Sequence, residues 1–259
     1  MQRHFLENET MSSLFQPDPA TVALFAPTGR LRASINLGNP ILAGTDPATG
    51  RARGISVDLA QALAERLGVA LETIEFPAAA KSVDAVTSGV ADVGFFAVDP
   101  LRGAEVAFTA PYLLIEGAYL VRDDSRCRAN EDVDMAGTTV TVGQGSAYDL
   151  FLTRELRQAA FLRVAGAQAV VEALLAGRAD VAGGIRQVLV DVAARTPGVR
   201  VLPGRFMVIR QAMGLARSRG PAAERALRAF VEEMKAGGFV AAAMQRHGVA
   251  GATMAPPAA

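Results

Sequence analysis

Three predicted strands of this sequence are each followed by residues that could bind a small anion. The strand "ADVGFF" is followed by Arg102, the strand in "TVTVGQGS" runs into Ser146, and "ADVAGGI" runs into Arg186. A planar guanidinium offers two parallel N–H donors to a carboxylate, a geometry that lysine lacks. Ligands of open α/β sheets bind beyond the carboxyl ends of the strands. These three segments are therefore the candidates for a ligand site.

Other chemistries have weaker support in the sequence. His4 and His247 are the only histidines and lack the spacing of metal ligands, so no metal site and no cofactor is predicted. Cys127 is the only cysteine, which excludes an internal disulfide, and its polar surroundings predict an exposed loop. The segment "GQGSAYD" lacks the Gly-Lys-Ser/Thr ending of a phosphate-binding loop. No Ser/His/Asp or Cys/His pairing for nucleophilic catalysis is evident.

A repeated segment indicates how the chain positions the candidate residues. "AVTSGVADVGF" begins at Ala85 and "ALLAGRADVAG" begins at Ala173, which is 173 − 85 = 88 residues later. Each copy is typical of a helix end, a glycine cap and a strand, because glycine adopts the left-handed cap conformation at little steric cost. We interpret the copies as equivalent parts of two α/β lobes, each with its own sheet, joined by two extended crossings.

Hydrophobic spacing predicts the other elements of both lobes. The first lobe reads as strand "LRASINLG", helix "VDLAQALAERLG" closed by Gly68, strand "ALETIEF", helix "KSVDAVTSG" and strand "ADVGFF". The same order returns between "TTVTVGQGS" and "ADVAGGI", which predicts an α/β fold with parallel strands. A short helix is expected near Pro19 to Phe25. Two helices split by Gly237 and Gly238 are expected near the end, before a frayed tail.

The composition is typical of a globular protein with a substantial core. The chain has 259 residues, 51% of them hydrophobic, and its 26 basic residues balance 26 acidic ones. A nucleic-acid surface would need an excess of basic residues, so nucleic-acid binding is not expected. No apolar run approaches the roughly 20 residues of a membrane span. The N-terminus lacks a basic region followed by an apolar stretch, so the sequence as written predicts a cytoplasmic protein.

In their order and spacing, these segments resemble the polar-amino-acid type, or family 3, solute-binding proteins of ABC transporters. The resemblance runs from about Leu31 to Gly248 and depends most on "AVTSGVADVGFFAVDPLRGAEVAFTAPY", in which a strand leads to an arginine and then to Phe-Thr-x-Pro-Tyr. "GISVDLAQALAERLG", "TVTVGQGSAYD" and "LLAGRADV" are further matches. The resemblance implies an α/β clamp of the type II periplasmic-binding-protein fold. Its two Rossmann-like lobes would be joined by two hinge strands and close on a ligand.

The resemblance also implies how the chain is divided. Residues 1–30 would form an N-terminal arm, residues 31–117 and 213–250 the first lobe, and residues 122–208 the second lobe. Residues 118–121 and 209–212 would be the hinge, and residues 251–259 the tail. Such a protein is expected to be a monomer that binds a small-molecule carboxylate and delivers it to an ABC permease. Proteins of the family work in the periplasm, whereas the sequence as written lacks an export signal.

Several residues match positions at which the family holds the α-carboxylate of its ligand. Arg102 matches the arginine that binds this group, and Ala97 matches a position that donates its backbone N–H. Gly145, Ser146 and Ala147 match the hydroxyl and N–H donors of the second lobe. The resemblance therefore implies a ligand that carries a carboxylate.

Other positions depart from the family pattern. Ile185 stands where the family has an aspartate for the ligand's ammonium, and Asn36 stands where a second acid is frequent. The usual aromatic walls fall near Asn39 and Ala79. The predicted cleft therefore also contains polar residues at other positions, namely Asn36, Asn39, Lys81, Arg186 and Gln187. Phe95 and Tyr148 are predicted to form its apolar walls.

This set of residues favours an anion over a zwitterion, although Glu116 or Asp99 could hold an amine. Two alternatives to a transport protein stay open. Dehydratases acting on prephenate-like or arogenate-like substrates (cyclohexadienyl or arogenate dehydratases) resemble this clamp, and Glu116 is the one acid that could serve such an enzyme. The effector domains of some transcription regulators share the architecture, which suggests a cytosolic ligand sensor, although no helix-turn-helix segment is evident. Because no acid/base pair is evident, binding without catalysis is expected.

Overall fold

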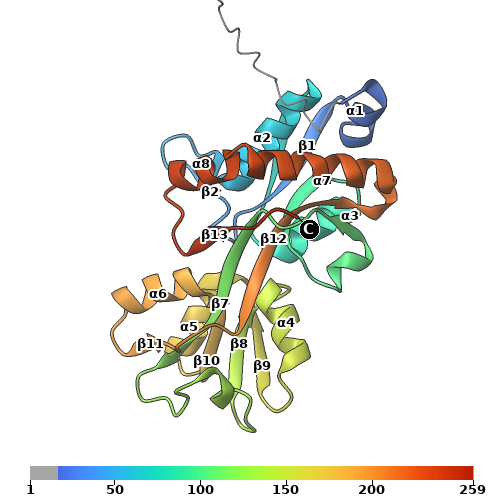
Figure 1. Ribbon diagram of the computed structural model, residues 1–259. Helices are drawn as coiled ribbons and strands as arrows, with labels where there is room; N and C mark the ends of the chain where they lie inside the picture. Colours follow the sequence, from blue (N-terminus) through green and yellow to red (C-terminus); the bar gives the residue numbers. More distant parts are fainter. Residues whose placement is uncertain (1–16, 259) are drawn as a thin grey trace, which may run out of the picture.

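The computed structural model describes residues 17–258 and shows two α/β lobes connected by two long strands (Figure 1). The first lobe combines segments from both ends of the chain. Its elements are α1 (Pro19–Phe25), β1 (Arg30–Asn36), β2 (Gly44–Thr45), β3 (Ala52–Arg53), α2 (Ile55–Leu67), β4 (Ala70–Phe76), α3 (Ala79–Thr87), β5 (Val93–Ala97), β6 (Val106–Phe108), α7 (Gly220–Ala236), α8 (Phe239–Arg246) and β13 (Ala252–Met254).

The second lobe is built from the middle of the chain and repeats the alternation of strand and helix. Its elements are β8 (Thr139–Gly143), α4 (Ala147–Glu155), β9 (Ala160–Val164), α5 (Gly166–Leu175), β10 (Val181–Ile185), α6 (Arg186–Arg195) and β11 (Val199–Val201). Strands β8, β9 and β10 pair in parallel, as do β1, β4 and β5 in the first lobe. The two-lobe α/β clamp predicted from the sequence is therefore confirmed.

Helix α2 shows why the local sequence gives these elements. Ile55, Leu59 and Leu63 recur every four residues, so they share one face of the helix, and each is fully buried in the core of the first lobe. Gly68 ends the helix in the left-handed conformation with φ 69°, as expected. No described helix combines the length and the apolar character that a membrane span requires.

Two crossing strands of ten residues each, β7 (Leu113–Arg122) and β12 (Met207–Ala216), connect the lobes. Residues 113–117 of β7 pair antiparallel with residues 207–211 of β12. Beyond this shared segment, β12 continues into the first lobe beside β5, and β7 continues into the second lobe beside β10. The hinge and lobe boundaries inferred from the sequence stay predictions.

The sheet itself differs from the sequence expectation of one sheet per lobe. Eleven of the described strands form one hydrogen-bonded sheet in the order β4-β1-β5-β12-β7-β10-β8-β9, with β6, β11 and β13 at its side, and β2 and β3 pair with each other in a separate small sheet. The crossing strands cause this continuity, because each is long enough to pair with strands of one lobe at one end and with the other crossing strand at the other. The two repeat copies still lie in different lobes, on opposite sides of the crossing strands (Figure 1).

The aspartates of the repeat have the same role in both lobes. Asp92 precedes β5 and accepts the backbone N–H of Arg32 at 2.9 Å; Asp180 precedes β10 and accepts the backbone N–H of Thr139 at 2.9 Å. Each aspartate therefore ties the start of one strand to its parallel neighbour. The repeated aspartate therefore makes the same structural contact in both lobes.

The surroundings of the two aspartates differ, although their role is shared. The Asp92 side chain is fully buried and also binds the guanidinium groups of Arg32 and Arg219. The Asp180 side chain is 49% exposed, and Arg122 approaches it only to 3.7 Å. Asp92 therefore lies within a buried ion-pair cluster, whereas Asp180 is half in solvent.

The two ends of the described chain are more ordered than the sequence suggested. Helix α1 forms at Pro19–Phe25 as expected, capped by the Asp18 side chain, which accepts the N–H of Thr21. Residues 1–16 of the predicted arm, His4 among them, lie outside the described residues. The expectation of a frayed tail is wrong for β13, which pairs with β7, since Ala252 faces Ile115 and Met254 faces Leu113. The predicted split of the last two helices is confirmed, with Gly238 at φ 74°.

The environment of Cys127 also differs from the expectation of an exposed loop. Its side chain is 1% exposed, and its thiol donates to the carbonyl oxygen of Asp132 at 3.5 Å. Arg200 on β11 donates to the Cys127 carbonyl at 2.7 Å, so β11 holds this polar loop against the second lobe. A polar sequence does not reveal that a loop folds back over its own thiol.

We expect Asp92→Ala to destabilise the fold far more than Asp180→Ala. Removing Asp92 leaves Arg32 and Arg219 facing each other with little solvent, and breaking a buried ion pair from one side costs about 3–5 kcal/mol. Asp180 is half exposed, so its loss should cost about 1 kcal/mol. Urea denaturation would show this as a lower midpoint at unchanged slope. Equal midpoint shifts for the two variants would contradict it.

Candidate ligand-binding site between the lobes

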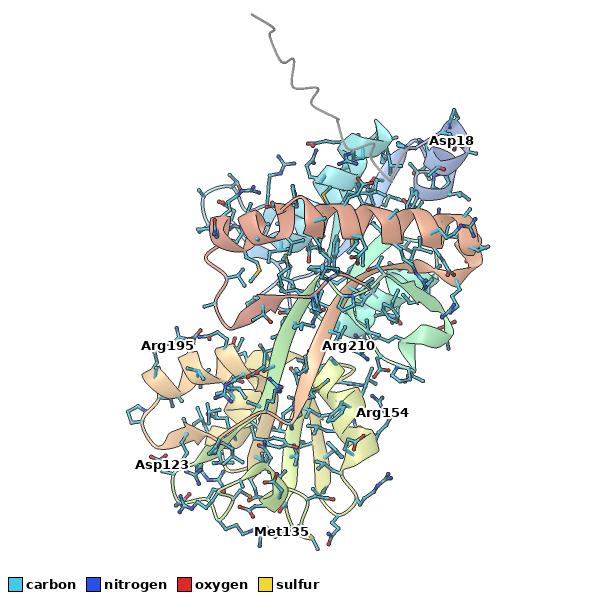
Figure 2. The ribbon with its side chains drawn as sticks, viewed as in Figure 1. Asp18, Asp123, Met135, Arg154, Arg195 and Arg210 are labelled. Atoms are coloured by element: carbon cyan, nitrogen blue, oxygen red, sulfur yellow. The ribbon has the colours of Figure 1, made fainter. Side chains whose placement is uncertain are left out.

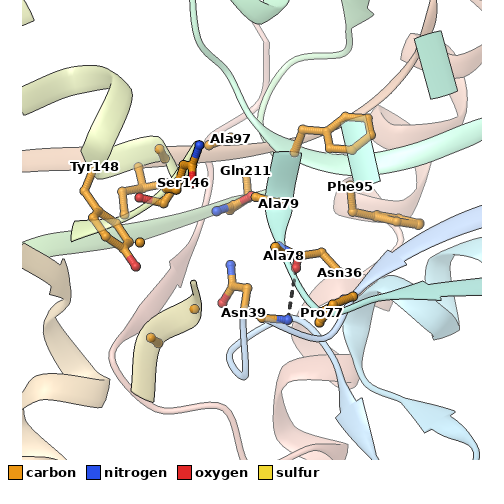
Figure 3. Close-up of a pocket in the computed structure, with 18 of the residues that line it drawn as sticks. Asn36, Asn39, Pro77, Ala78, Ala79, Phe95, Ala97, Ser146, Tyr148 and Gln211 are labelled. Atoms are coloured by element: carbon orange, nitrogen blue, oxygen red, sulfur yellow. Dashed lines mark hydrogen bonds between the residues drawn. The ribbon is translucent and has the colours of Figure 1, made fainter. Parts of the chain in front are cut away.

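A cavity of about 70 Å³ lies where the lobes meet, and its lining comes from both lobes and from crossing strand β12 (Figure 3). Its lining residues mostly follow the carboxyl ends of strands, where ligands of α/β sheets bind. The first lobe contributes Asn36, Gly38, Asn39, Pro77, Ala78, Ala79, Phe95, Phe96, Ala97 and Arg102; the second contributes Gly143, Gln144, Ser146, Ala147, Tyr148, Gly166 and Ala167; β12 contributes Ile209 and Gln211.

Arg102 supplies the one charged side chain among the described residues that line this cavity. It begins the short 3₁₀ turn η1 (Arg102–Ala104) after β5 and is 8% exposed. Its Nη1 donates to the Ala97 carbonyl at 3.2 Å, and its Nη2 donates to the Gly145 carbonyl of the other lobe at 2.8 Å. Burial lowers the pKa of the guanidinium, and nearby Asp99 partly opposes this effect. The cavity therefore contains a desolvated positive charge bonded here to neutral oxygens.

The start of helix α4 forms the opposite wall, and its turn explains the sequence "GQGSAYD". Gly145 has φ 67°, and a Cβ there would lie 2.9 Å from the Cβ of Ala80 in the other lobe. Ser146 is the N-cap, because its Oγ accepts the N–H of Asp149 at 3.1 Å. Asp149 also accepts the N–H of Gly145 at 2.8 Å and the Arg163 guanidinium at 2.9 Å. These hydrogen bonds hold the turn in place without a ligand.

The predicted donors of the second lobe are only partly available. The Gly145 N–H bonds Asp149, and the Ser146 N–H bonds the Gly143 carbonyl at 3.0 Å. The N–H of Ala147 belongs to the first turn of α4, where no helix carbonyl can accept it. A helix N-terminus also carries a partial positive charge. The Ala147 N–H and the Ser146 hydroxyl are therefore the groups on this wall that suit an anion.

Uncharged amides line the space between these walls. Asn36 and Asn39 each use their side-chain oxygen locally, on the N–H groups of Gly38 at 3.0 Å and Ile41 at 3.2 Å. Gln211 on β12 is 4% exposed, and its side-chain amide makes no hydrogen bond with any described residue. Figure 3 shows the amides of Asn39 and Gln211 directed into the space between Tyr148 and Phe95. Phe95 and Tyr148 are buried and line the cavity with apolar surface, and their role as walls of a ligand cleft stays a prediction.

Sequence reasoning missed Gln211 and the pair Gly166-Ala167. Gln211 lies in "MVIRQAMGLA", where Ile209 and Met213 on the same strand face are buried, so a lone amide on an apolar face was the available signal. Gly166 and Ala167 follow the carboxyl end of β9 at the start of α5, and the strand end itself was the available signal. The position of Gln211 depends on β5, a strand far away in the sequence, whereas β9 pairs with its near neighbour β8.

Four residues predicted for the cleft are not part of the lining of this cavity. Gly145 lies between the lining residues Gln144 and Ser146, and its carbonyl accepts Arg102. Lys81 is exposed on α3. Arg186 and Gln187 begin α6 and line a separate cavity of about 410 Å³ together with Glu116, Arg205 and Val208. The register explains this placement, because Ile185 pairs with Gly117 and so brings Arg186 beside Glu116. Ile209 and Gln211 line the first cavity and Val208 the second, so the two cavities face opposite sides of β12.

The two acids considered for a ligand amine are both paired away from the cavity. Glu116 accepts Arg205 at 2.5 Å and lies 3.7 Å from Arg186. Asp99 is 4% exposed and accepts the Nη2 of Arg154 at 2.8 Å. Arg154 belongs to α4 of the second lobe (Figure 2), so this ion pair joins the lobes beside the cavity. Among the described lining residues, none carries a carboxylate side chain.

Comparison with known proteins places the chain among binding proteins. The sequence model for bacterial extracellular solute-binding proteins, family 3, matches residues 43–250. No curated protein matches the sequence. Cysteine-binding protein from Campylobacter jejuni has a similar structure, with 18% identity, a TM-score of 0.74, and coverage of 88% of this chain and 92% of that one.

Two further solved structures show the same fold at low identity. A mutant of ArgBP from T. maritima shares 21% identity with a TM-score of 0.72, covering 87% of this chain and 98% of that one. An ancestral amino acid-binding protein, described as a precursor of cyclohexadienyl dehydratase, gives the same identity, TM-score and coverages. These likenesses support the two-lobe clamp.

We expect Arg154→Ala to favour separation of the lobes, because it removes the partner of buried Asp99. The Arg154 side chain is 41% exposed, so the pair should contribute about 0.5–1 kcal/mol to lobe contact. The ratio of open to closed protein should then rise about two- to fivefold. Small-angle scattering would detect a larger radius of gyration. Arg157→Ala removes an exposed arginine of the same lobe and should leave the radius unchanged; equal radii for both variants and wild type would contradict a role for the pair.

Proposed function

The chain belongs to family 3 of the bacterial extracellular solute-binding proteins, and we propose that it captures a small carboxylate-bearing ligand, an amino acid or a related organic acid, between its lobes. One observation carries this proposal. Arg102 is buried in a cavity whose other described lining side chains are uncharged. A carboxylate is the complementary group of suitable size and geometry.

The energetics of burial support an anionic ligand. A buried charge is costly unless it is paired, and the Arg102 guanidinium contacts only the carbonyl oxygens of Ala97 and Gly145 here. A guanidinium has five N–H donors, so donors remain beyond these two contacts. A carboxylate bound to them would neutralise the desolvated charge. The Ser146 hydroxyl and the Ala147 N–H would then complete its contacts from the second lobe.

The size of the cavity favours a small ligand and a clamp that opens to admit it. Ligand pockets usually enclose about 300–1,000 Å³, whereas this cavity encloses about 70 Å³. The lobes also touch directly through Arg102 and Gly145 and through Asp99 and Arg154. Bending of β7 and β12 would separate these contacts, and a ligand that touches both lobes would favour closure.

Membership of the family supports a role in transport. In this proposal the closed, ligand-bound protein delivers its ligand to an ABC permease. A cytosolic ligand sensor would use the same cavity in the same way, so the two roles differ in the partner that recognises the closed lobes. A measurement of whether an ABC permease binds the ligand-loaded protein would distinguish the two roles.

An enzyme on the same clamp is the second candidate, favoured by the likeness to a precursor of cyclohexadienyl dehydratase. General acid catalysis needs a proton donor within hydrogen-bond reach of the leaving group. Glu116, the acid considered for this role, faces the other cavity and is paired with Arg205. The arrangement of the described residues therefore favours binding over dehydration.

Substitution of Arg102 tests the proposal most directly. A thermal-shift screen of carboxylates first identifies a ligand, because a ligand that binds only the folded protein raises its midpoint. Loss of one partner from a buried charge pair costs about 2–5 kcal/mol, so Arg102→Ala should weaken binding roughly 30-fold or more. Arg102→Lys should recover only part of this loss, because an ammonium cannot make the bidentate contact.

Calorimetric titration of wild type and both variants would measure these affinities. Arg225→Ala is the matched control, because Arg225 is exposed on α7 and lies outside the described lining of the cavity. Equal affinity of wild type and Arg102→Ala would place the carboxylate site elsewhere and refute the proposal.

The enzyme alternative has its own test. We expect no turnover of prephenate or arogenate by the purified chain, because no described lining residue carries a carboxylic acid. Glu116→Gln should likewise leave ligand affinity unchanged, because Glu116 faces the other cavity. Proton NMR of the substrate over time would measure turnover. Turnover that disappears in Glu116→Gln would establish the dehydratase instead.

A further inference from the structure

We propose that Gln211 sets the ligand class, so that the protein selects carboxylic acids with an uncharged hydroxyl or oxo substituent against the corresponding amino acids. This inference rests on the proposed function, because it concerns the same cavity and assumes a carboxylate on Arg102. It goes further in naming the residue that contacts the rest of the ligand and the chemistry that the residue accepts.

The first observation is the state of the Gln211 side chain. The residue is 4% exposed, yet its amide makes no hydrogen bond with any described residue, and the side chain lines the cavity. Its amide atoms are not among the fully buried polar atoms that lack a partner, so the amide keeps access to the open space of the cavity, where a ligand group can replace water as its partner. An amide offers both a donor and an acceptor, so it can pair with a hydroxyl, which has both, or with an oxo group, which accepts.

The second observation is where β12 places this amide relative to Arg102. Gln211 pairs with Ala97 across the β5–β12 ladder. The Ala97 carbonyl is the oxygen that accepts Nη1 of Arg102 at 3.2 Å. Residues directly opposite in an antiparallel pair lie about 4.5–5.5 Å apart at Cα. A carboxylate on Arg102 would therefore place its neighbouring carbon and substituent beside Gln211.

The third observation is the charge of the cavity. A ligand ammonium would need a carboxylate, because a buried cation without one keeps its full desolvation cost. The described lining has none, and its single charge is the like-charged Arg102. Asp99 and Glu116 are bound to Arg154 and Arg205, outside the lining. A hydroxyl or oxo group needs only the dipole of the Gln211 amide, so the site should discriminate by charge.

Titration calorimetry of the full chain tests this selectivity with ligands of matched skeleton. Glycolate is compared with glycine, and L-lactate and pyruvate are compared with L-alanine. We expect the hydroxy or oxo acid to bind about 10-fold more tightly or better than the amino acid, because an unpaired buried charge carries at least this cost. Equal or tighter binding of the amino acid would overturn the inference.

A charge change at Gln211 tests the residue itself. Gln211→Glu keeps the shape and adds the missing carboxylate, so the preference should reverse toward the amino acid, by about 10-fold or more. Gln211→Leu should lose hydroxy-acid or oxo-acid affinity without gaining the amino acid. Gln245→Glu is the matched control, because it adds the same charge at an exposed position of α8 outside the described lining and should not reverse the preference.

The outcomes separate this inference from the proposed function. If wild type binds no carboxylate and Arg102→Ala changes nothing, the proposed function fails and the inference fails with it. If carboxylates bind through Arg102 but Gln211→Glu and Gln211→Leu both keep the wild-type preference, the function stands and the inference is wrong. If Gln211→Glu does not fold, as a lost thermal midpoint would show, Gln211→Leu and the wild-type series decide alone.

Discussion

The antiparallel pairing of β7 with β12 is the constraint on which the rest of the structure depends. Residues 113–117 pair with residues 207–211, and beyond this segment each strand joins the sheet of a different lobe. The chain thus crosses between the lobes twice and returns its last two helices to the first lobe (Figure 1). Because side chains alternate along a strand, β12 presents Gln211 to the interlobe cavity and Val208 to the opposite one. In Figure 2, Arg210 of the same strand lies between the lobes.

The crossing of the two strands also determines where charged side chains lie around the cavity. Contacts between the lobes gather at the edges of the cavity, where Arg102 bonds Gly145 and Asp99 bonds Arg154. Glu116 is paired with Arg205 and Asp99 with Arg154, and the cavity retains one guanidinium whose pKa is lowered by burial. A small space with one desolvated cation and several uncharged amides is suited to an anion. The same arrangement gives little support for acid catalysis.

The internal repeat reflects the architecture of the lobes more than the site. Asp92 and Asp180 each fasten a strand start to its parallel neighbour, and Gly89 and Gly177 precede them with φ 78° and 68°. In both lobes the chain ends a helix and enters a sheet within a few residues, and the glycine and the aspartate serve this transition. Arg219, at the turn before α7, contacts Asp92 and makes the first copy more buried than the second.

The sequence by itself determined the local elements, the two-lobe class and the segments from which the cavity is built. Periodicity located α2 and α7, glycines located the helix ends, and the strand ends at Ala97 and Gly143 border the cavity. Only the tertiary structure decided which side chains reach it. The pairing of Ile185 with Gly117 moved Arg186 to the other cavity, and the pairing of β12 with β5 brought Gln211 in. Helices and turns follow from neighbours in sequence, whereas the register and facing of a strand are set by partners that can lie far away in the sequence, as Gln211 and Ala97 do at 211 − 97 = 114 residues. A shift of one residue turns every side chain of a strand to the opposite face.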